Sequence, residues 1–154
     1  MERKTQIHTE PDKQDLLITR DFDLPVELLF TAFVEPEIVA QWMGTKVLKL
    51  ACQRHGAYLF ETTGPDGSIH LFSGVIHEFV PNQKITRTFE MEHTPFPVQL
   101  EFLEFEKTGD HSSRLRMHIV YKSLEYKNQM LRLPFAQGLN LAHNRLQEIV
   151  QKRI

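Results

Sequence analysis

The feature that most restricts the fold of this chain is a succession of strand-like runs between residues 46 and 121. The runs are rich in β-branched and aromatic residues, and short turn sequences containing glycine, proline or asparagine separate them. Because such short loops join neighbouring strands, the runs should pair as antiparallel hairpins. In chain order the six runs are KVLKLAC, AYLFETT, IHLFSGVIHEFV, KITRTFEME, VQLEFLEFEK and RLRMHIVY.

An amphipathic helix of about 20 residues, beginning near Leu133 and Pro134, follows the strands. Its apolar residues recur at spacings of four and three, which predicts a stripe facing a core: Phe135, Leu139, Ala142, Leu146 and Ile149. Ahead of the strand-rich region, residues 16–22 are a further strand candidate, followed by two short helices that Glu35 and Pro36 separate. This order predicts an α+β fold in which one strongly curved antiparallel sheet wraps around the long C-terminal helix.

Side-chain alternation assigns faces to the last two strands. Residues 114–121 alternate cleanly, with Arg114, Arg116 and His118 opposite an apolar face of Leu115, Met117, Ile119 and Tyr121. In residues 98–105 the apolar positions change parity, from Val98, Leu100 and Phe102 to Leu103 and Phe105. A β-bulge near Phe102 would reconcile the two halves. We interpret the acidic residues of this strand as a solvated face: Glu101, Glu104 and Glu106.

Length and charge limit the partners that the chain can have. With 154 residues, one domain is expected over residues 15–154, preceded by a polar, flexible arm over residues 1–14. The formal net charge of −2 argues against a nucleic-acid partner. No signal peptide is recognised, and no apolar run approaches the roughly 20 residues that cross a bilayer. The single cysteine, Cys52, cannot form an internal disulfide, which favours a reducing, cytoplasmic location.

The polar residues do not form a recognisable metal-binding or catalytic set. The eight histidines never occur at the i, i+2 or i, i+4 spacing of ligand pairs, and no HExxH or CxxC motif is present. Cys52 has no base near it in the sequence and is interpreted as an inert thiol. We therefore expect no metal and no cofactor, and we assign no catalytic residue; whether the protein is an enzyme stays open.

Two stretches carry a resemblance to a known superfamily. Residues 18–44, ITRDFDLPVELLFTAFVEPEIVAQWMG, resemble the opening of the SRPBCC (START/Bet v 1-like) superfamily, and within it the Aha1 C-terminal-domain-like, CalC-related branch. The matching positions are Leu24-Pro25, Leu29-Phe30, Glu35-Pro36-Glu37 and Trp42. Residues 62–90 are similar to the Pro-Asp-Gly hairpin and the glycine-containing strand of that branch. The resemblance extends over residues 15–152 and implies a helix-grip fold with an internal cavity, one end of which the two short helices plug.

Within such a fold, strand parity and family position together indicate which side chains would line the cavity. The apolar candidates are Trp42, Tyr58, Phe60, Phe72, Met117, Phe135 and Leu139, and the polar candidate is His143. Trp42 has two possible roles. It could close the mouth of the cavity with its N–H toward water, or it could fix the second short helix to the sheet.

Three functions are compatible with this reading. The first is a protein that binds or carries a small apolar or aromatic molecule in an internal cavity. The second is a co-chaperone-like module with a protein partner, related to the activators of the Hsp90 ATPase. The third is a cyclase- or aromatase-like enzyme, since one fold supports many activities. A carrier predicts a mostly apolar cavity, an enzyme predicts titratable groups that converge inside it, and a co-chaperone predicts an exposed contact surface.

Overall fold

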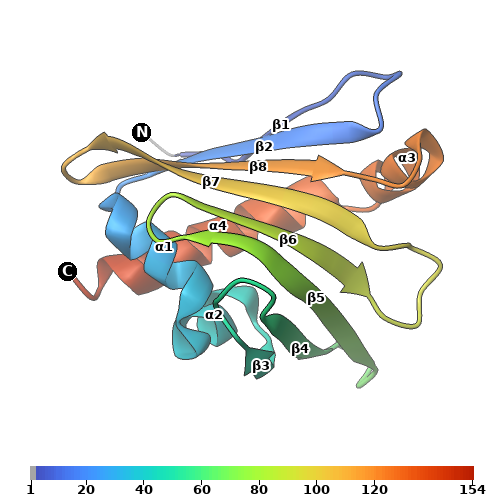
Figure 1. Ribbon diagram of the computed structural model, residues 1–154, viewed down its shortest axis with the longest axis horizontal. Helices are drawn as coiled ribbons and strands as arrows, with labels where there is room; N and C mark the ends of the chain where they lie inside the picture. The colour runs from blue at the N-terminus through green and yellow to red at the C-terminus, as the bar shows by residue number, and fades with distance from the viewer. Residues whose placement is uncertain (1–2) are drawn as a thin grey trace.

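The computed structural model describes residues 3–154, and these residues form one curved antiparallel sheet with helices on its concave side (Figure 1). The strand order is β1-β2-β8-β7-β6-β5-β4-β3. The strands are β1 (Gln6–His8), β2 (Asp15–Phe22), β3 (Lys46–Leu50), β4 (Ala57–Thr63), β5 (Ile69–Val80), β6 (Lys84–Met91), β7 (Gln99–Gly109) and β8 (Ser112–Val120). The helices are α1 (Val26–Val34), α2 (Pro36–Met43), α3 (Leu124–Arg132) and α4 (Phe135–Gln151).

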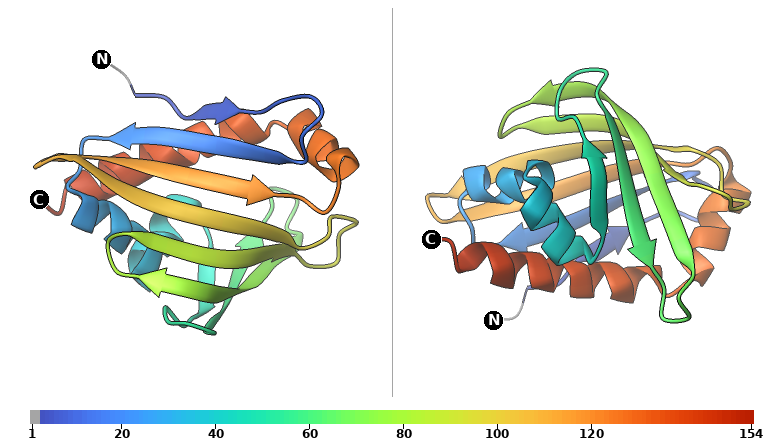
Figure 2. Two further views of the ribbon diagram at one scale, coloured as in Figure 1. Left: turned by 45° about the horizontal axis from the view of Figure 1, so that its top comes forward. Right: turned by 90° about the horizontal axis from the view of Figure 1, so that it is seen from below.

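The long helix α4 lies across the concave face of the sheet, with α1 and α2 beside it (Figure 2). The strands β3 to β8 pair in chain order as antiparallel hairpins, as their short connecting loops require, and β2 pairs antiparallel with β8. The predicted helix-grip α+β fold is therefore confirmed.

The short helices α1 and α2 are held together by the single tryptophan of the sequence. Pro36 opens α2, and Gly44, in the left-handed conformation at φ 61°, ends it. The Trp42 ring packs edge-on against Phe33 with centroids 5.2 Å apart, and its indole N–H donates to the Ala32 carbonyl at 2.6 Å. Trp42 is only 4% exposed. Its polar atom therefore serves the packing of α2 on α1 rather than contact with water.

The N-terminal segment contains an edge strand that the sequence analysis did not predict. Residues 1–14 were expected to form a flexible arm; residues 1 and 2 of it lie outside the described residues, whereas Gln6–His8 form β1 and pair with β2. The segment is also held by α4, because the Thr5 amide donates to Asn140 Oδ1 at 2.9 Å and the Thr5 hydroxyl lies 2.6 Å from His143 Nδ1.

A further unpredicted element is α3, which joins β8 to α4. Ser123 caps it by accepting a hydrogen bond from the Tyr126 amide. Lys127 on this helix is buried, and its ammonium donates to the Thr9 hydroxyl and to the Glu10 carbonyl, at 3.0 and 2.7 Å. These contacts fasten the β1–β2 loop to α3.

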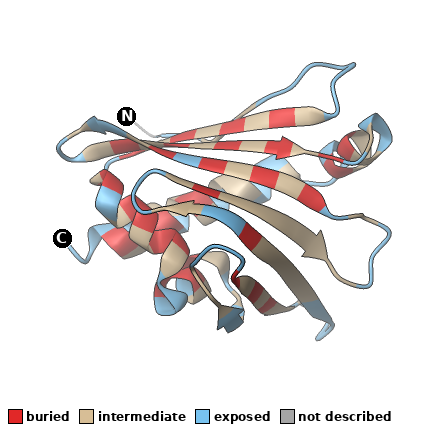
Figure 3. Ribbon diagram, in the orientation of Figure 1, coloured by how far each residue is buried: buried red, intermediate tan, exposed pale blue. Residues whose placement is uncertain are grey.

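Burial alternates along the central strands and defines the core face (Figure 3). The β7 register is unbroken from Gln99 to Glu104 with β6 and from Leu100 to Lys107 with β8, so the predicted β-bulge near Phe102 is wrong. The register shifts occur instead at Val47/Lys49, Ile76/Glu78 and Lys107/Gly109. Regular alternation through β7 turns four side chains toward the concave side of the sheet: Gln99, Glu101, Leu103 and Phe105.

Candidate ligand-binding site

The concave surface of β4, β5 and β6 carries a continuous group of aromatic side chains. Tyr58 and Phe60 lie with ring centroids 5.1 Å apart, and Phe60 is directly opposite Phe72 on β5. Phe72 in turn stacks on Phe89 of β6, with centroids 5.6 Å apart. Because every second residue of a strand faces the same side, this group is a consequence of strand register.

Gly74 allows Tyr58 to lie flat over β5. The two residues are register partners, and a Cβ at position 74 would collide with the Tyr58 hydroxyl and with the Thr88 carbonyl. The Tyr58 hydroxyl donates to that Thr88 carbonyl at 2.5 Å. Burial raises the pKa of Tyr58, so this hydroxyl remains a protonated donor.

A polar cluster, made of Arg87, Gln99 and Glu101, lies next to the aromatic group. Arg87 Nε donates to Glu101 Oε1 at 2.9 Å, and Gln99 Nε2 donates to Glu101 Oε2 at 2.7 Å. The Arg87 and Glu101 side chains are 12% and 4% exposed, and the Arg87 guanidinium lies 5.3 Å from the centroid of the Tyr58 ring. The two charges compensate each other, as an ion pair in the interior requires.

Tyr121 extends this cluster from the neighbouring strand. It follows β8 on the same face as Ile119 and is 5% exposed. Its hydroxyl oxygen is the one buried side-chain polar atom within residues 3–154 that has no hydrogen-bond partner. Burial, and secondarily the charge of Glu101, raise the pKa of Tyr121, which keeps the hydroxyl protonated.

The polar cluster was missed by the sequence analysis, which interpreted Glu101 as part of a solvated face. That interpretation is wrong for Glu101, although it holds for Glu104, which is exposed. The signal was present in the sequence. Leu103 and Phe105 face inward, and every second residue of a strand lies on the same face. Counting back two and four residues from Leu103 therefore places Glu101 and Gln99 on the inner face.

The two halves of α4 pack differently against the sheet. In the second half, Leu146 and Val150 are fully buried. In the first half, Phe135 and Leu139 are only partly buried, although they belong to the same apolar stripe. Three inner-face side chains of the sheet are also partly buried: Phe72, Phe89 and Met91. The first turns of α4 and the β4–β5 hairpin lie at the same end of the molecule (Figures 1 and 2).

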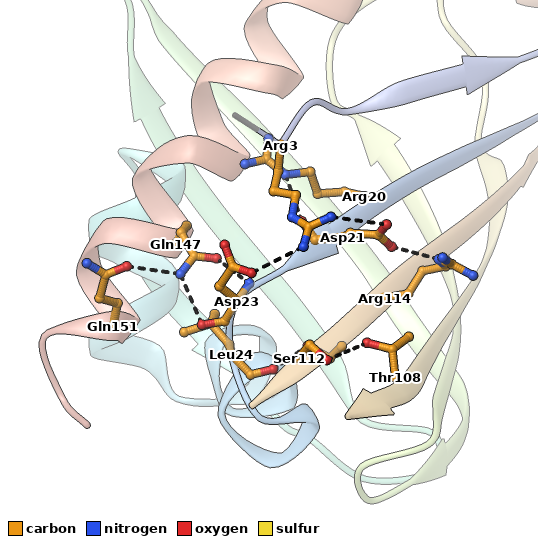
Figure 4. Close-up of polar contacts among 11 residues, drawn as sticks. Arg3, Arg20, Asp21, Asp23, Leu24, Thr108, Ser112, Arg114, Gln147 and Gln151 are labelled. Carbon is orange, nitrogen blue, oxygen red and sulfur yellow. Dashed lines mark hydrogen bonds and ion pairs between the residues drawn. The ribbon is translucent and has the colours of Figure 1, made fainter. Parts of the chain in front are cut away.

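The opposite end is fastened by polar contacts (Figure 4). Gln147 of α4 accepts a hydrogen bond from the Asp23 amide at 2.9 Å and donates to the Asp23 carbonyl at 3.3 Å. Arg3 lies 3.4 Å from the Asp23 carboxylate, and Arg114 donates to Asp21 at 2.7 Å. These contacts tie the C-terminal half of α4 to the junction between β2 and α1.

The predicted lining residues fall into separate groups. Tyr58, Phe60 and Phe72 belong to the aromatic group, and Phe135 and Leu139 belong to the loosely packed half of α4. Met117 is buried between Ile18 and Leu103 in the centre of the sheet. Trp42 and His143 contact each other, with ring centroids 6.3 Å apart. The Nδ1 atom of His143 already forms a hydrogen bond with the Thr5 hydroxyl.

The outer face of the sheet holds an open groove of about 790 Å³ whose wall combines charged side chains with apolar ones such as Leu17 and Phe102. Phe102 stacks on His118 there, and His118 Nε2 lies 2.7 Å from the Asp15 carboxylate. Both side chains are about two-fifths exposed, so water already solvates them. The charged, open groove is therefore a weaker candidate for an apolar ligand than the inner face.

Comparison with known proteins assigns the chain to a family. The sequence model described as "Activator of Hsp90 ATPase homolog 1-like protein" matches residues 23–151. The chain belongs to this family. The resemblance inferred from residues 18–44 and 62–90 is thereby confirmed. No curated protein matches the sequence.

Solved structures with the fold of this family member come from several bacteria. A protein from Rhodobacter sphaeroides has a TM-score of 0.86 at 18% identity, covering 97% of this chain and 99% of the other. A protein from Mycobacterium smegmatis has a TM-score of 0.84 at 21% identity, covering 94% and 95%. CalU16 from Micromonospora echinospora has a TM-score of 0.68 at 15% identity, covering 99% and 94%. At these identities the similarity concerns the fold alone.

In this member of the family, His, Cys, Asp and Glu side chains do not gather into a metal-binding group anywhere in residues 3–154. Within the same residues, every helix is too short or too polar to span a bilayer. Cys52 is partly buried, with its sulfur 3.7 Å from the Val34 carbonyl, and burial raises the pKa of its thiol. A thiol held in the protonated form is a poor nucleophile.

Proposed function

We propose that this protein binds a small apolar or aromatic molecule between the concave face of β4–β6 and the first half of α4. The observation that carries the proposal is the incomplete burial of aromatic side chains that face inward. Phe72 and Phe89 stack on each other on the inner face but remain partly exposed, as does Phe135 on α4. A binding site for an apolar ligand requires such concave, solvent-accessible aromatic surface.

The rest of the inner face supports this location. Leu146 and Val150 are fully buried in the second half of α4, whereas Phe135 and Leu139 keep accessible apolar surface in the first half. The compensated polar cluster offers a few fixed polar groups beside the aromatic ones, which is the usual composition of a small-molecule site. The lining residues predicted from the sequence, including Trp42 and His143, remain part of the proposal.

Native mass spectrometry of freshly purified protein, together with calorimetric titration of 2-methylnaphthalene, tests this function. We expect saturable binding, accompanied by a change in the emission of the single tryptophan, Trp42. Phe72→Ala should weaken binding at least about tenfold, equivalent to ~1.4 kcal/mol, because a stacked ring is lost.

Phe102→Ala is the matched control, since Phe102 lies on the outer face of the sheet. It should leave the affinity for 2-methylnaphthalene unchanged. Absence of heat and of any mass shift across a panel of apolar and aromatic compounds would contradict the proposed function.

A protein-partner role is the second candidate, favoured by membership in a family described by activation of the Hsp90 ATPase. Exposed leucines surround the α3–α4 junction, where a partner could contact them: Leu131, Leu133 and Leu141. If the role applies, the protein raises the ATPase rate of an Hsp90, and Leu133→Ser with Leu141→Ser reduces the effect. Leu48→Ser, at an exposed leucine on β3, is the control. An unchanged ATPase rate with the wild-type protein would exclude this role for the Hsp90 used.

A further inference from the structure

The polar cluster on the inner face leaves several hydrogen-bonding positions unused. Both Glu101 oxygens are occupied, one by Arg87 and one by Gln99. The two terminal nitrogens of Arg87 and the side-chain oxygen of Gln99 have no hydrogen-bond partner among residues 3–154. These atoms retain some solvent contact, whereas the equally unpartnered Tyr121 hydroxyl is sealed. Buried polar groups are normally satisfied, so the sealed Tyr121 hydroxyl beside these available donors requires an explanation.

These unused atoms occupy one place on the sheet. Arg87 and Glu101 are register partners on β6 and β7, and Leu100 pairs with Val120, so Gln99 and Tyr121 follow as the next opposite pair. The Arg87 guanidinium lies over the Tyr58 ring, which belongs to the aromatic group. A ligand whose apolar body rests on the aromatic group would therefore bring one end to the Arg87 terminal nitrogens.

The charge balance restricts what that end can be. Glu101 already neutralises Arg87, so a ligand carboxylate would add an uncompensated negative charge to a largely buried position. A neutral oxygen acceptor adds no charge and still accepts charge-assisted hydrogen bonds from the guanidinium. The same oxygen can accept from the Tyr121 hydroxyl after a small side-chain adjustment, since burial keeps that hydroxyl protonated.

We propose that Arg87, assisted by the Tyr121 hydroxyl, binds a carbonyl oxygen at one end of an aromatic or apolar ligand, while Gln99 holds Glu101 in place. Glu101 sets the selectivity, because its charge makes this position reject carboxylates. The inference rests on the proposed function and adds to it the chemical class of the ligand: neutral aromatic ketones and related carbonyl compounds.

Calorimetric affinities for three probes of one size test the inference: 2-acetylnaphthalene, 2-methylnaphthalene and 2-naphthoate. The wild-type protein should bind the ketone about tenfold more tightly than the methyl compound, and the carboxylate most weakly. Glu101→Gln should improve the affinity of naphthoate relative to the ketone at least about tenfold, because Arg87 then lacks its counter-ion. Glu104→Gln, an exposed glutamate on the same strand, should leave all three affinities within about twofold of wild type.

Two further variants keep the test decisive if Glu101→Gln fails to fold. Tyr121→Phe removes a hydroxyl that bonds to nothing in residues 3–154, so the unfolding midpoint should be unchanged or higher, while ketone affinity falls about threefold or more. Arg87→Met combined with Glu101→Met removes both charges together, a replacement that interiors tolerate, and should abolish the preference for the ketone over the methyl compound.

The outcomes separate this inference from the proposed function. Equal wild-type affinities for the ketone and the methyl compound would overturn the role of Arg87 and leave ligand binding intact. An unchanged ratio of carboxylate to ketone affinity in a folded Glu101→Gln protein would overturn the selectivity assigned to Glu101. If none of the three probes binds, the proposed function is contradicted and the inference fails with it.

Discussion

His143 illustrates how strongly surroundings change the chemistry of one residue. It is 1% exposed, its ring packs edge-on against Phe22, and Trp42 lies on another side. Burial lowers the pKa of His143 to about 3, and the positive charge of Arg20 contributes in the same direction. The residue is therefore neutral in the folded protein at pH 7. It forms a hydrogen bond with the Thr5 hydroxyl and does not serve as an acid.

This depressed pKa makes folding stability depend on pH. Unfolded His143, with the ordinary pKa of 6.5, binds a proton below that pH, whereas folded His143 stays neutral down to about pH 3. The unfolded state therefore binds more protons in this window, so the free energy of unfolding falls as the pH falls. We expect a loss of about 2 kcal/mol between pH 7 and pH 5, measured by urea denaturation.

The pH series needs a variant without this titration. His143→Gln should flatten the dependence between pH 7 and pH 5, whatever its stability at pH 7, and His111→Gln, at an exposed histidine, should retain the wild-type slope. Identical slopes for His143→Gln and the wild type would show that another group is responsible.

At the scale of the elements, α4 is one helix with two packing environments. Its second half is an ordinary core helix, and its first half presents apolar residues that neighbouring groups only partly cover. The tight half is also the half that Gln147 ties to Asp23. The helix is thus anchored in its C-terminal half by two fully buried apolar side chains and by the hydrogen bonds of Gln147.

The two halves should respond differently to the same truncation. Leu146→Ala should lower the free energy of unfolding by about 2–5 kcal/mol, since a fully buried side chain is removed. Leu139→Ala, seven residues earlier on the same stripe, should cost about 1 kcal/mol or less, because its leucine is only partly buried. Chemical denaturation of both variants measures the difference. Large and equal losses would mean that Leu139 is packed as tightly as Leu146.

At the scale of the whole molecule, the fold follows from patterns that are local in the sequence. Period-two alternation, short turns and an apolar stripe of helical period identify the strands β2–β8 and the helix α4 without knowledge of their partners. By contrast, β1 and α3 depend on contacts with distant residues. Thr5 is held by Asn140 and His143, and Lys127 holds the loop near Thr9. Such long-range contacts leave no periodic signal.

The candidate site was predictable only in its aromatic part. Tyr58, Phe60 and Phe72 follow from strand parity, because apolar residues on the inner face repeat regularly. Glu101 looks like a surface residue until its partner Arg87 is known, and that partner lies on another strand fourteen residues earlier. A buried ion pair is a property of two residues together, so the polarity of Glu101 alone assigned it to the wrong environment.

The two edges of the sheet have a consequence for how copies of the protein meet. The edge strand β1 has three residues, and the other edge strand, β3, is interrupted by a register shift between Val47 and Lys49. Long, flat edge strands are templates on which further chains add by backbone hydrogen bonding. A short edge and an irregular, lysine-bearing edge are poor templates. An open, curved sheet can therefore remain unclosed without inviting intermolecular strand addition and aggregation.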